Sequence, residues 1–444
     1  MKLPEHILYC IQTLERAGFP AYAVGGCVRD ALLGIRPHDY DLCTSALPQQ
    51  IRDLFSAYPQ VHAGEKHGTV GVIFGQEVVE ITTFRREGGY GDHRHPDWVQ
   101  FVSSVEEDLS RRDFTVNAMA WSPTRGLADP FGGQRDLQQG ILRAVGEPEA
   151  RFREDALRIL RGVRFAARFR LQPEEKTRQA MEALAPLLET IAAERIFEEL
   201  TGILLCTDAE HLLTFARVLV TAVPELAPAV GFDQCNPHHA YDLYTHIAWV
   251  TDGVPAERSL RWAAFLHDLG KIATFTRDET GRGHFYGHGK EGATAAEEIL
   301  IRLKAPGELR REVVLLISEH MNLLSPDRKL LRRRISRFGP EFLEKLLILQ
   351  RADRRAKGTG TPDESEFDAA QAMLRQILAE EGALTLKSLQ ISGHDLMELG
   401  IPAGKTMGSV LNRLLELVLE EKIENAPAPL REKALELYGE EEAK

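Results

Sequence analysis

The sequence predicts an α+β protein, in which a small α/β head precedes a long helical remainder. Strand-like and helix-like stretches alternate over roughly the first 125 of 444 residues. From residue 152 onward, apolar residues recur at helical spacing almost to the end. A chain of this length exceeds one compact core, so we expect several domains. Their predicted ranges are 1–125 for the head, 126–205 for a neck, 206–375 for a body and 376–444 for a tail.

The composition is that of an ordinary globular protein, with 43% hydrophobic and 27% charged residues. Its five cysteines form no Cys-x-x-Cys pair, which argues for a reducing setting and against a disulfide framework or a zinc ribbon. The first residues lack the apolar core of a signal peptide, and no uncharged stretch is long enough to cross a bilayer. We therefore expect a cytoplasmic protein without a membrane partner. The oligomeric state stays open.

The formal net charge of −12 argues mildly against nucleic-acid binding. A binding face needs only a local positive patch, however, and two basic stretches supply one each, at residues 151–170 and 328–337.

A phosphate-binding turn is predicted near the N-terminus. Helical spacing over residues 5–17 precedes a strand over residues 20–24. Gly25 and Gly26 then let the backbone approach a ligand closely, and the N–H groups that open the next helix face an anion. Arg29, one turn into that helix, adds a fixed positive charge.

Three acids follow on predicted strands. Asp39 and Asp41 are two residues apart, so on a strand both carboxylates point to one face. Neighbouring carboxylates repel each other unless a cation such as a divalent metal lies between them. Glu80, in the strand-like run 77–83, faces away from its Val and Ile neighbours. An isolated Asp-x-Asp is usually a turn or a solvated strand end. Beside a phosphate turn, the acids Asp39, Asp41 and Glu80 predict a two-metal nucleotidyl-transfer site.

The remaining head elements are a helix over residues 47–55 and a strand over residues 68–74. Residues 85–96 are rich in Gly and charge and lack periodicity, which is typical of a surface loop. The loop is either a plain hairpin tip or a segment that closes over a ligand. Residues 108–120 follow with two arginines, Arg111 and Arg112, which suit a triphosphate or a ribose.

Residues 152–169 predict one helix with two distinct faces. The apolar stripe comprises Ala156, Ile159, Leu160, Val163 and Ala167. The opposite face carries Glu154, Asp155, Arg158, Arg161 and Arg164. Such a face is ordinarily a solvated surface with ion pairs between neighbouring turns.

Base chemistry offers a second interpretation of this charged face. A and C each present an amino donor beside a ring-nitrogen acceptor, whereas G and U present the reverse order. Asp155 accepting from the amino group and Arg158 donating to the ring nitrogen would admit A and C and reject G and U. Arg161 and Arg164 would then hold phosphates.

With these motifs, the chain resembles the bacterial class II tRNA nucleotidyltransferases, which are the CCA-adding enzymes and their A-adding and poly(A) polymerase relatives. Besides the turn with Asp-x-Asp, the motifs are Arg-Arg-Asp-Phe-Thr-Val-Asn-Ala at 111–118, Asp-Pro-Phe-Gly-Gly at 129–133, Glu-Asp-Ala-Leu-Arg at 154–158 and Glu-Arg-Ile-Phe-Glu-Glu-Leu at 194–200. The resemblance implies a polymerase-β-like head that adds C, C and A from CTP and ATP to the 3′ end of tRNA, without a template, and releases pyrophosphate. It implies Mg²⁺ at Asp39 and Asp41. It also implies nucleotide contacts from Gly26, Arg29, Arg112, Asp155, Arg158, Arg161 and Arg164.

Two details bear on the choice among these relatives. Residues 67–70, His-Gly-Thr-Val, look like the CCA type, and the loop at 85–96 looks like the loop that the final A requires. A-only addition and poly(A) synthesis remain the alternatives. Residues 391–425 look like the family's tail domain, which holds the elbow of tRNA.

A second cluster looks like an HD phosphohydrolase domain. Its first ligands would be His246, His267, Asp268 and Asp353, with His288 and His320 nearby. This mixed nitrogen and oxygen set suits a divalent metal such as Mg, Mn, Ni or Zn.

One alternative to a metal-binding HD domain is a decayed domain kept as a helical spacer. Another is an HD phosphohydrolase whose head only binds nucleotides, and a third is a non-catalytic tRNA-binding protein, which would not need the head acids.

Overall fold

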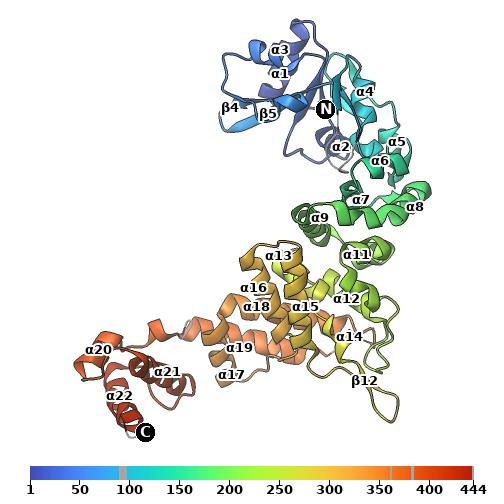
Figure 1. Ribbon diagram of the computed structural model, residues 1–444. Coiled ribbons are helices and arrows are strands. Elements are labelled where there is room, and N and C mark those ends of the chain that lie inside the picture. Colours follow the sequence, from blue (N-terminus) through green and yellow to red (C-terminus); the bar gives the residue numbers. More distant parts are fainter. Residues whose placement is uncertain (90–97, 361–362, 382–384, 443–444) are drawn as a thin grey trace. The chain divides into compact units, whose positions relative to one another are not determined.

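The computed structural model describes residues 1–89, 98–360, 363–381 and 385–442. The chain divides into two compact units, Met1–Ala227 with Ile301–Ala305 and Pro228–Leu300 with Pro306–Lys444. The predicted α+β class, with a mixed head followed by helices, is confirmed (Figure 1). Within the described residues, no helix is both long and apolar enough to cross a membrane.

A twisted sheet forms the centre of the head, and among the described residues it has seven strands in the order β3-β4-β5-β2-β1-β8-β9. Only β2 and β5 pair in parallel; the other neighbours are antiparallel. The strands are β1 (Ala21–Val24), β2 (Asp41–Thr44), β3 (Gln60–Val61), β4 (Thr69–Phe74), β5 (Glu77–Thr83), β8 (Ala120–Ser122) and β9 (Gly126–Ala128). The sheet thus continues past the expected end of the head at residue 125.

Short helices cover this sheet. In α1 (Glu5–Arg16), Ile7, Cys10, Ile11 and Leu14 recur at helical spacing and are buried in the core of the head. The other elements here are α2 (Gly26–Leu32), α3 (Pro48–Leu54), η1 (Glu65–His67), α4 (Val105–Ser110), η2 (Thr115–Asn117), α5 (Gly133–Gln139) and β10 (Ile141–Leu142). Most head elements therefore match the ranges predicted from periodicity.

The predicted loop at residues 85–96 is only partly described. Its first residues form β6 (Arg85–Gly88), which pairs with β7 (Trp98–Phe101). Residues 90–96 of that prediction lie outside the described residues.

The neck continues the first unit with helices. They are α6 (Pro148–Glu154), α7 (Leu157–Phe169), α8 (Glu175–Leu184), α9 (Ala193–Cys206), α10 (Ala209–Thr214) and α11 (Ala216–Ala222), with β11 (Gln172–Pro173) and η3 (Ala185–Thr190) between them. The apolar stripe of α7 is buried as predicted.

The prediction of one continuous helix over residues 152–169 is wrong. The chain is extended at Asp155, with φ −141° and ψ 103°, so α6 ends and α7 begins there. The Asp155 side chain accepts a hydrogen bond from the Leu157 N–H at 3.0 Å, and its carbonyl accepts one from the Arg158 N–H. Short Asp side chains compete in this way with helical backbone bonds.

The second unit is almost entirely helical. Its body contains η4 (Pro224–Ala229, shared with the first unit), α12 (Leu243–Gly253), α13 (Arg258–Leu266), α14 (Gly270–Thr274), β12 (Thr276–Arg277), β13 (Gly283–His284), α15 (His288–Arg302, also shared with the first unit), α16 (Gly307–Glu319), α17 (Arg328–Phe338), α18 (Pro340–Arg355) and α19 (Ser365–Glu381). Its tail contains η5 (Leu386–Ser388), α20 (Gly393–Glu398), α21 (Lys405–Leu419) and α22 (Pro427–Glu442), around a small core of its own.

Candidate functional site

Asp41 and Glu80 lie on neighbouring strands of the head. Leu42 of β2 is paired in parallel register with Ile81 of β5, and both side chains are buried. Asp41 and Glu80 each precede these residues by one position, so their side chains point outward from the opposite face of the sheet. Together with Asp39 they line a cavity of about 560 Å³. The structure therefore brings the three predicted acids together.

Asp39 differs from its prediction in one respect. The strand begins at Asp41, and Asp39 lies in the segment just before it. The pKa of Asp41 is raised, mainly by burial. Arg112 lowers this pKa in part, and the charge of Asp39 adds to the increase. Carboxylates that disfavour each other's charge around one cavity fit a divalent cation, which would relieve the repulsion.

The glycine turn contacts Arg112. Gly25 has φ +77°, and a Cβ built on it would lie 2.8 Å from Nη1 of Arg112. The Arg112 Nη2 lies 3.7 Å from Asp108, and its Nε has no hydrogen-bond partner among the described residues. Arg112 is therefore held near Asp41 with donor capacity to spare, while Gly26, the next residue, opens α2.

Arg29 lies on α2, one turn beyond the glycine turn, as the sequence predicts, and its nucleotide contact stays a prediction. It is buried, donates to Asp30 at 2.6 Å and also to Asn117, and its guanidinium lies 4.1 Å from the ring centroid of Phe169. Burial lowers its pKa. Arg29 is not among the residues that line the acidic cavity; in this structure it joins α2 to α7.

The predicted nucleotide-binding residues of the neck have partners within the first unit. Arg158 donates to Glu154 at 2.7 Å and to the carbonyl of Arg111 at 3.1 Å. Arg164 donates to Glu199 at 2.7 Å. The predicted base-reading residues Asp155 and Arg158 are thus close in sequence but bound to different partners.

Two of these pairings were missed from the sequence. Arg161 donates to Asp113 at 2.8 and 2.9 Å, and Arg195 donates to Asp155 at 3.2 Å. Burial by itself raises the pKa of Asp113. The effects of Arg161 and Asn117 outweigh burial and lower this pKa to about 2. The available signals were the motifs at 111–118 and 194–200, which carry Asp113 and Arg195.

The predicted basic stretch at 328–337 is largely neutralised within the second unit. Arg332 is buried 3.1 Å from Glu421, Arg333 pairs with Glu420, and Arg334 lies 3.2 Å from Glu319. This helix, α17, therefore connects the body to the tail rather than presenting an unpaired basic face.

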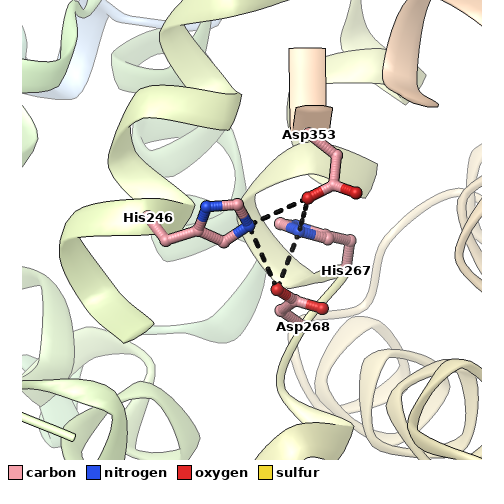
Figure 2. Close-up of side chains that lie close together, drawn as sticks. All are labelled: His246, His267, Asp268 and Asp353. Carbon is pink, nitrogen blue, oxygen red and sulfur yellow. Dashed lines mark ion pairs between the residues drawn. The ribbon is translucent and has the colours of Figure 1, made fainter. Parts of the chain in front are cut away.

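The HD residues form a buried cluster, shown in Figure 2. The Nε2 of His246 lies 3.2 Å from Asp268 and 3.0 Å from Asp353, and the Nε2 of His267 lies 3.2 Å from Asp268. These four ligand atoms lie within 4.8 Å of one another. All four predicted ligands are thus brought together.

Main-chain carbonyls orient the imidazoles of this cluster. The Nδ1 atoms lie within 3.2 Å of Ala356 O for His246, Ala264 O for His267, Phe285 O for His288 and Ile317 O for His320. Their Nε2 atoms are buried and face the carboxylates of Asp268 or Asp353; burial lowers the pKa of His246, but these two carboxylates raise it, to about 9. Buried nitrogen lone pairs and carboxylates that converge in this way fit a divalent metal.

Two further residues near the cluster were not singled out from the sequence. Lys271 lies 2.6 Å from Asp268, and Gln234 accepts a hydrogen bond from it. The ring of His239 lies 5.2 Å from that of His246, and burial lowers the pKa of His239 to about 3. Burial also lowers the pKa of His320, to about 4. Lys271 ends the run His-Asp-Leu-Gly-Lys at 267–271, which also holds two of the predicted ligands.

Comparisons with known proteins agree with this architecture. The chain matches the poly A polymerase head domain over residues 21–143, the probable RNA and SrmB- binding site of polymerase A over residues 169–229 and the HD domain over residues 209–358. It also matches the tRNA nucleotidyltransferase domain 2 over residues 289–434.

Similarity to whole proteins is equally extensive. The chain is 35% identical to the CCA-adding enzyme of Lactobacillus helveticus over 98% of both sequences, and 33% identical to that of Bacillus velezensis over 94% of both. The structure of the Bacillus stearothermophilus CCA-adding enzyme in complex with CTP matches with a TM-score of 0.76 and 30% identity, over 100% of both chains. A head with three acids around one cavity, a helical neck and these full-length matches lead to one conclusion: the chain belongs to the family of CCA-adding enzymes.

Proposed function

We propose that this chain adds C, C and A, from CTP and ATP, to the 3′ end of tRNA and releases pyrophosphate. The observation that carries the proposal is the cavity shared by Asp39, Asp41 and Glu80. A protein that only bound tRNA, or an HD phosphohydrolase with a nucleotide-binding head, would not need three acids there. The relatives reported above are CCA-adding enzymes, which favours full CCA addition over A-only addition or poly(A) synthesis.

In the head, Asp39, Asp41 and Glu80 would hold divalent metal, and we propose Mg²⁺ as the ion. When bound, the metal activates the attacking 3′-hydroxyl and stabilises the leaving pyrophosphate. Arg112, whose charge lowers the pKa of Asp41, supplies positive charge for the triphosphate, and the glycine turn at Gly25 packs against its guanidinium.

In the neck, Asp155 and Arg158 would read the base. Each already has a partner, Arg195 and Glu154 respectively. These contacts orient both side chains, and the remaining lone pairs of Asp155 and N–H groups of Arg158 would meet the base edge. Arg161 and Arg164, paired with Asp113 and Glu199, are proposed to lie along the phosphates.

In the body, His246, His267, Asp268 and Asp353 would hold a second divalent metal, such as Mg, Mn, Ni or Zn. Its support is the convergence of two buried imidazole nitrogens on two carboxylates. The division into head, neck, body and tail, and tRNA binding by the tail, also remain proposals. The cytoplasmic location stays a prediction.

The decisive experiment supplies tRNA that lacks its CCA end with CTP, with ATP, and with both together. The proposal expects two C additions with CTP alone and a complete CCA only with both nucleotides. Extension by A alone would indicate an A-adding enzyme, long A tracts a poly(A) polymerase, and no extension a protein of another class.

A further inference from the structure

The carboxylate of Asp108 is 0% exposed, and its two oxygens have unlike surroundings. The Oδ1 atom accepts a hydrogen bond from the Arg85 N–H at 3.2 Å and lies 3.0 Å from Nε and 2.9 Å from Nη2 of Arg111. The Oδ2 atom is buried and has no hydrogen-bond partner among the described residues. A buried carboxylate oxygen without a donor is costly, so a nearby positive charge has to compensate for it.

Arg112 supplies that charge. Its Nη2 lies 3.7 Å from Oδ2 of Asp108, within the range of an ion pair but beyond the length of a hydrogen bond. Its Nε is buried and also has no hydrogen-bond partner in the described part of the chain. Asp108 therefore attracts the guanidinium of Arg112 without occupying its N–H groups.

This ion pair lies on the face of the sheet that carries the head acids. Leu109, the residue after Asp108 in α4, shares a core cluster with Cys43 of β2. Cys43 and Asp41 are two residues apart in that strand, so their side chains point to the same face. Burial raises the pKa of Asp41, and the charge of Arg112 lowers it in part. Asp108 thus holds Arg112 on the side where the proposed metal ligands lie.

The neighbouring Arg111 has a different role. Besides Oδ1 of Asp108, its guanidinium contacts Glu87 of β6, with Nη1 3.2 Å from Oε1. Its carbonyl oxygen accepts the hydrogen bond from Arg158 described above. The side chain of Arg111 therefore joins α4 to β6, whereas Arg112 keeps donors for a ligand.

The packing of α4 does not by itself require a charge at residue 108. An amide in place of the carboxylate would offer the same Oδ1 to Arg85 and Arg111, and Arg111 would keep Glu87 as a charged partner. The amide NH2 group, however, would lie against the guanidinium of Arg112, donor against donor. The second carboxylate oxygen therefore matters for Arg112 above all.

We propose that Asp108 is a positioning residue for nucleotide addition, which holds Arg112 toward the triphosphate of the incoming nucleotide. The inference rests on the function proposed above and adds a residue that does not itself contact the nucleotide. Because the pair is ionic and not hydrogen-bonded, no intramolecular hydrogen bond to Asp108 has to break when the triphosphate binds. Arg112 is oriented in advance, which lowers the entropy cost of binding.

Asp108→Asn tests this role, with inorganic tripolyphosphate as a probe that has neither base nor ribose. Titration calorimetry in the presence of Mg²⁺ measures its Kd without relying on activity. We expect this Kd to rise about tenfold, as on loss of an interaction with a charged group. The KM for CTP should rise in parallel, while the KM for tRNA should stay the same. Glu107→Gln, at the neighbouring residue of α4 that pairs with Arg86 at 3.4 Å, is the matched control and should change neither.

A double variant tests whether Asp108 acts through Arg112. In the Arg112→Ala background, Asp108→Asn should have little further effect on the Kd of tripolyphosphate. Equal effects in both backgrounds, or an unchanged Kd in folded Asp108→Asn, would overturn the positioning role. Asp108→Ser, which keeps an acceptor in a smaller volume, replaces Asp108→Asn if circular dichroism shows that the latter does not fold.

The proposed function can fail separately. A wild-type protein that binds tripolyphosphate but adds no nucleotide to tRNA would overturn nucleotide addition, and the Kd values of the variants would still decide whether Asp108 positions Arg112. A wild-type protein that does not bind tripolyphosphate would overturn the positioning role.

Discussion

The guanidinium of Arg195 donates a hydrogen bond to Oδ2 of Asp155 at 3.2 Å, across the gap between α9 and the break that precedes α7. The other carboxylate oxygen, Oδ1, accepts the Leu157 N–H. Both oxygens are thus fixed, and the side chain is oriented before any nucleotide arrives. Arg195 is therefore a positioning residue for the proposed base reader.

Removal of the reader's carboxylate should change nucleotide selectivity. Asp155→Ala should lower CTP and ATP use and admit UTP, because U then no longer presents a carbonyl to a carboxylate. A bidentate base contact provides ~1–3 kcal/mol of discrimination, so the C-over-U preference should fall about 10- to 100-fold. Single-nucleotide extension of a tRNA that ends before its first C measures this. Glu149→Ala, at an exposed residue of α6, is the matched control. Unchanged selectivity in folded Asp155→Ala would mean that this face is an ordinary ion-paired surface.

Arg158 should behave differently. Arg158→Ala should lower the use of every nucleotide while the preference for C over U persists, since Asp155 still repels the carbonyl of U. Steady-state kcat/KM for each nucleotide separates the two variants. Equal effects of both substitutions on selectivity would contradict the division of roles.

The head acids should be essential for chemistry but not for RNA affinity. Asp41→Asn should lose nucleotide addition by at least about tenfold, because the proposed metal depends on this acid, whereas RNA affinity comes from distributed phosphate contacts. Glu77→Gln is the control: Glu77 lines the same cavity but pairs with His6 at 2.9 Å. Extension assays and tRNA binding by filter retention provide the two readouts. Activity of Asp41→Asn above a tenth of wild type would refute the metal assignment.

Asp113 should contribute a pH-dependent part of stability. Its folded pKa of about 2 is below the ordinary value of an Asp carboxyl, 3.8. The ionised form therefore stabilises the folded state above about pH 4, and that contribution, about 2 kcal/mol, is lost as the pH falls through 4 toward 2. Asp113→Asn should lower the midpoint of thermal unfolding at pH 7, and the gap from wild type should narrow by pH 3. The exposed Glu175→Gln should show a much smaller gap at every pH. A constant gap for Asp113→Asn would argue against the pairing with Arg161.

The two glycines of the turn should differ in their tolerance. Gly25→Ala faces both a φ of +77° and a contact of 2.8 Å with Arg112, whereas a Cβ on Gly26 meets only Arg29, at an ordinary 3.5 Å. We expect Gly25→Ala to destabilise the head by at least about 1 kcal/mol. Gly26→Ala should cost less. Chemical denaturation of both variants checks this, and equal destabilisation would show that the turn is not constrained at residue 25.

Local patterns were sufficient for most of the head and for the apolar stripe of α7, because periodicity reports directly which face is buried. They failed where a side chain competes with the backbone, as at Asp155. They also failed where the partner is remote in the chain. The sequence predicts a basic patch at Arg332 and Arg333, but in the structure these residues pair with Glu421 and Glu420. For the HD cluster, residue types signalled the ligands, but only the fold shows that His288 and His320 face the other oxygen of Asp268.

The carbonyl contacts of the four cluster histidines have a consequence for how this protein tolerates sequence drift. A carbonyl oxygen is present whatever residue occupies a position, so substitutions at Ala264, Phe285, Ile317 or Ala356 keep the acceptor that fixes each tautomer. In three of the four, the acceptor lies three residues before the histidine in the same local turn. The backbone conformation therefore fixes the orientation of each ring. Side chains around the cluster can be substituted while each Nε2 keeps its direction.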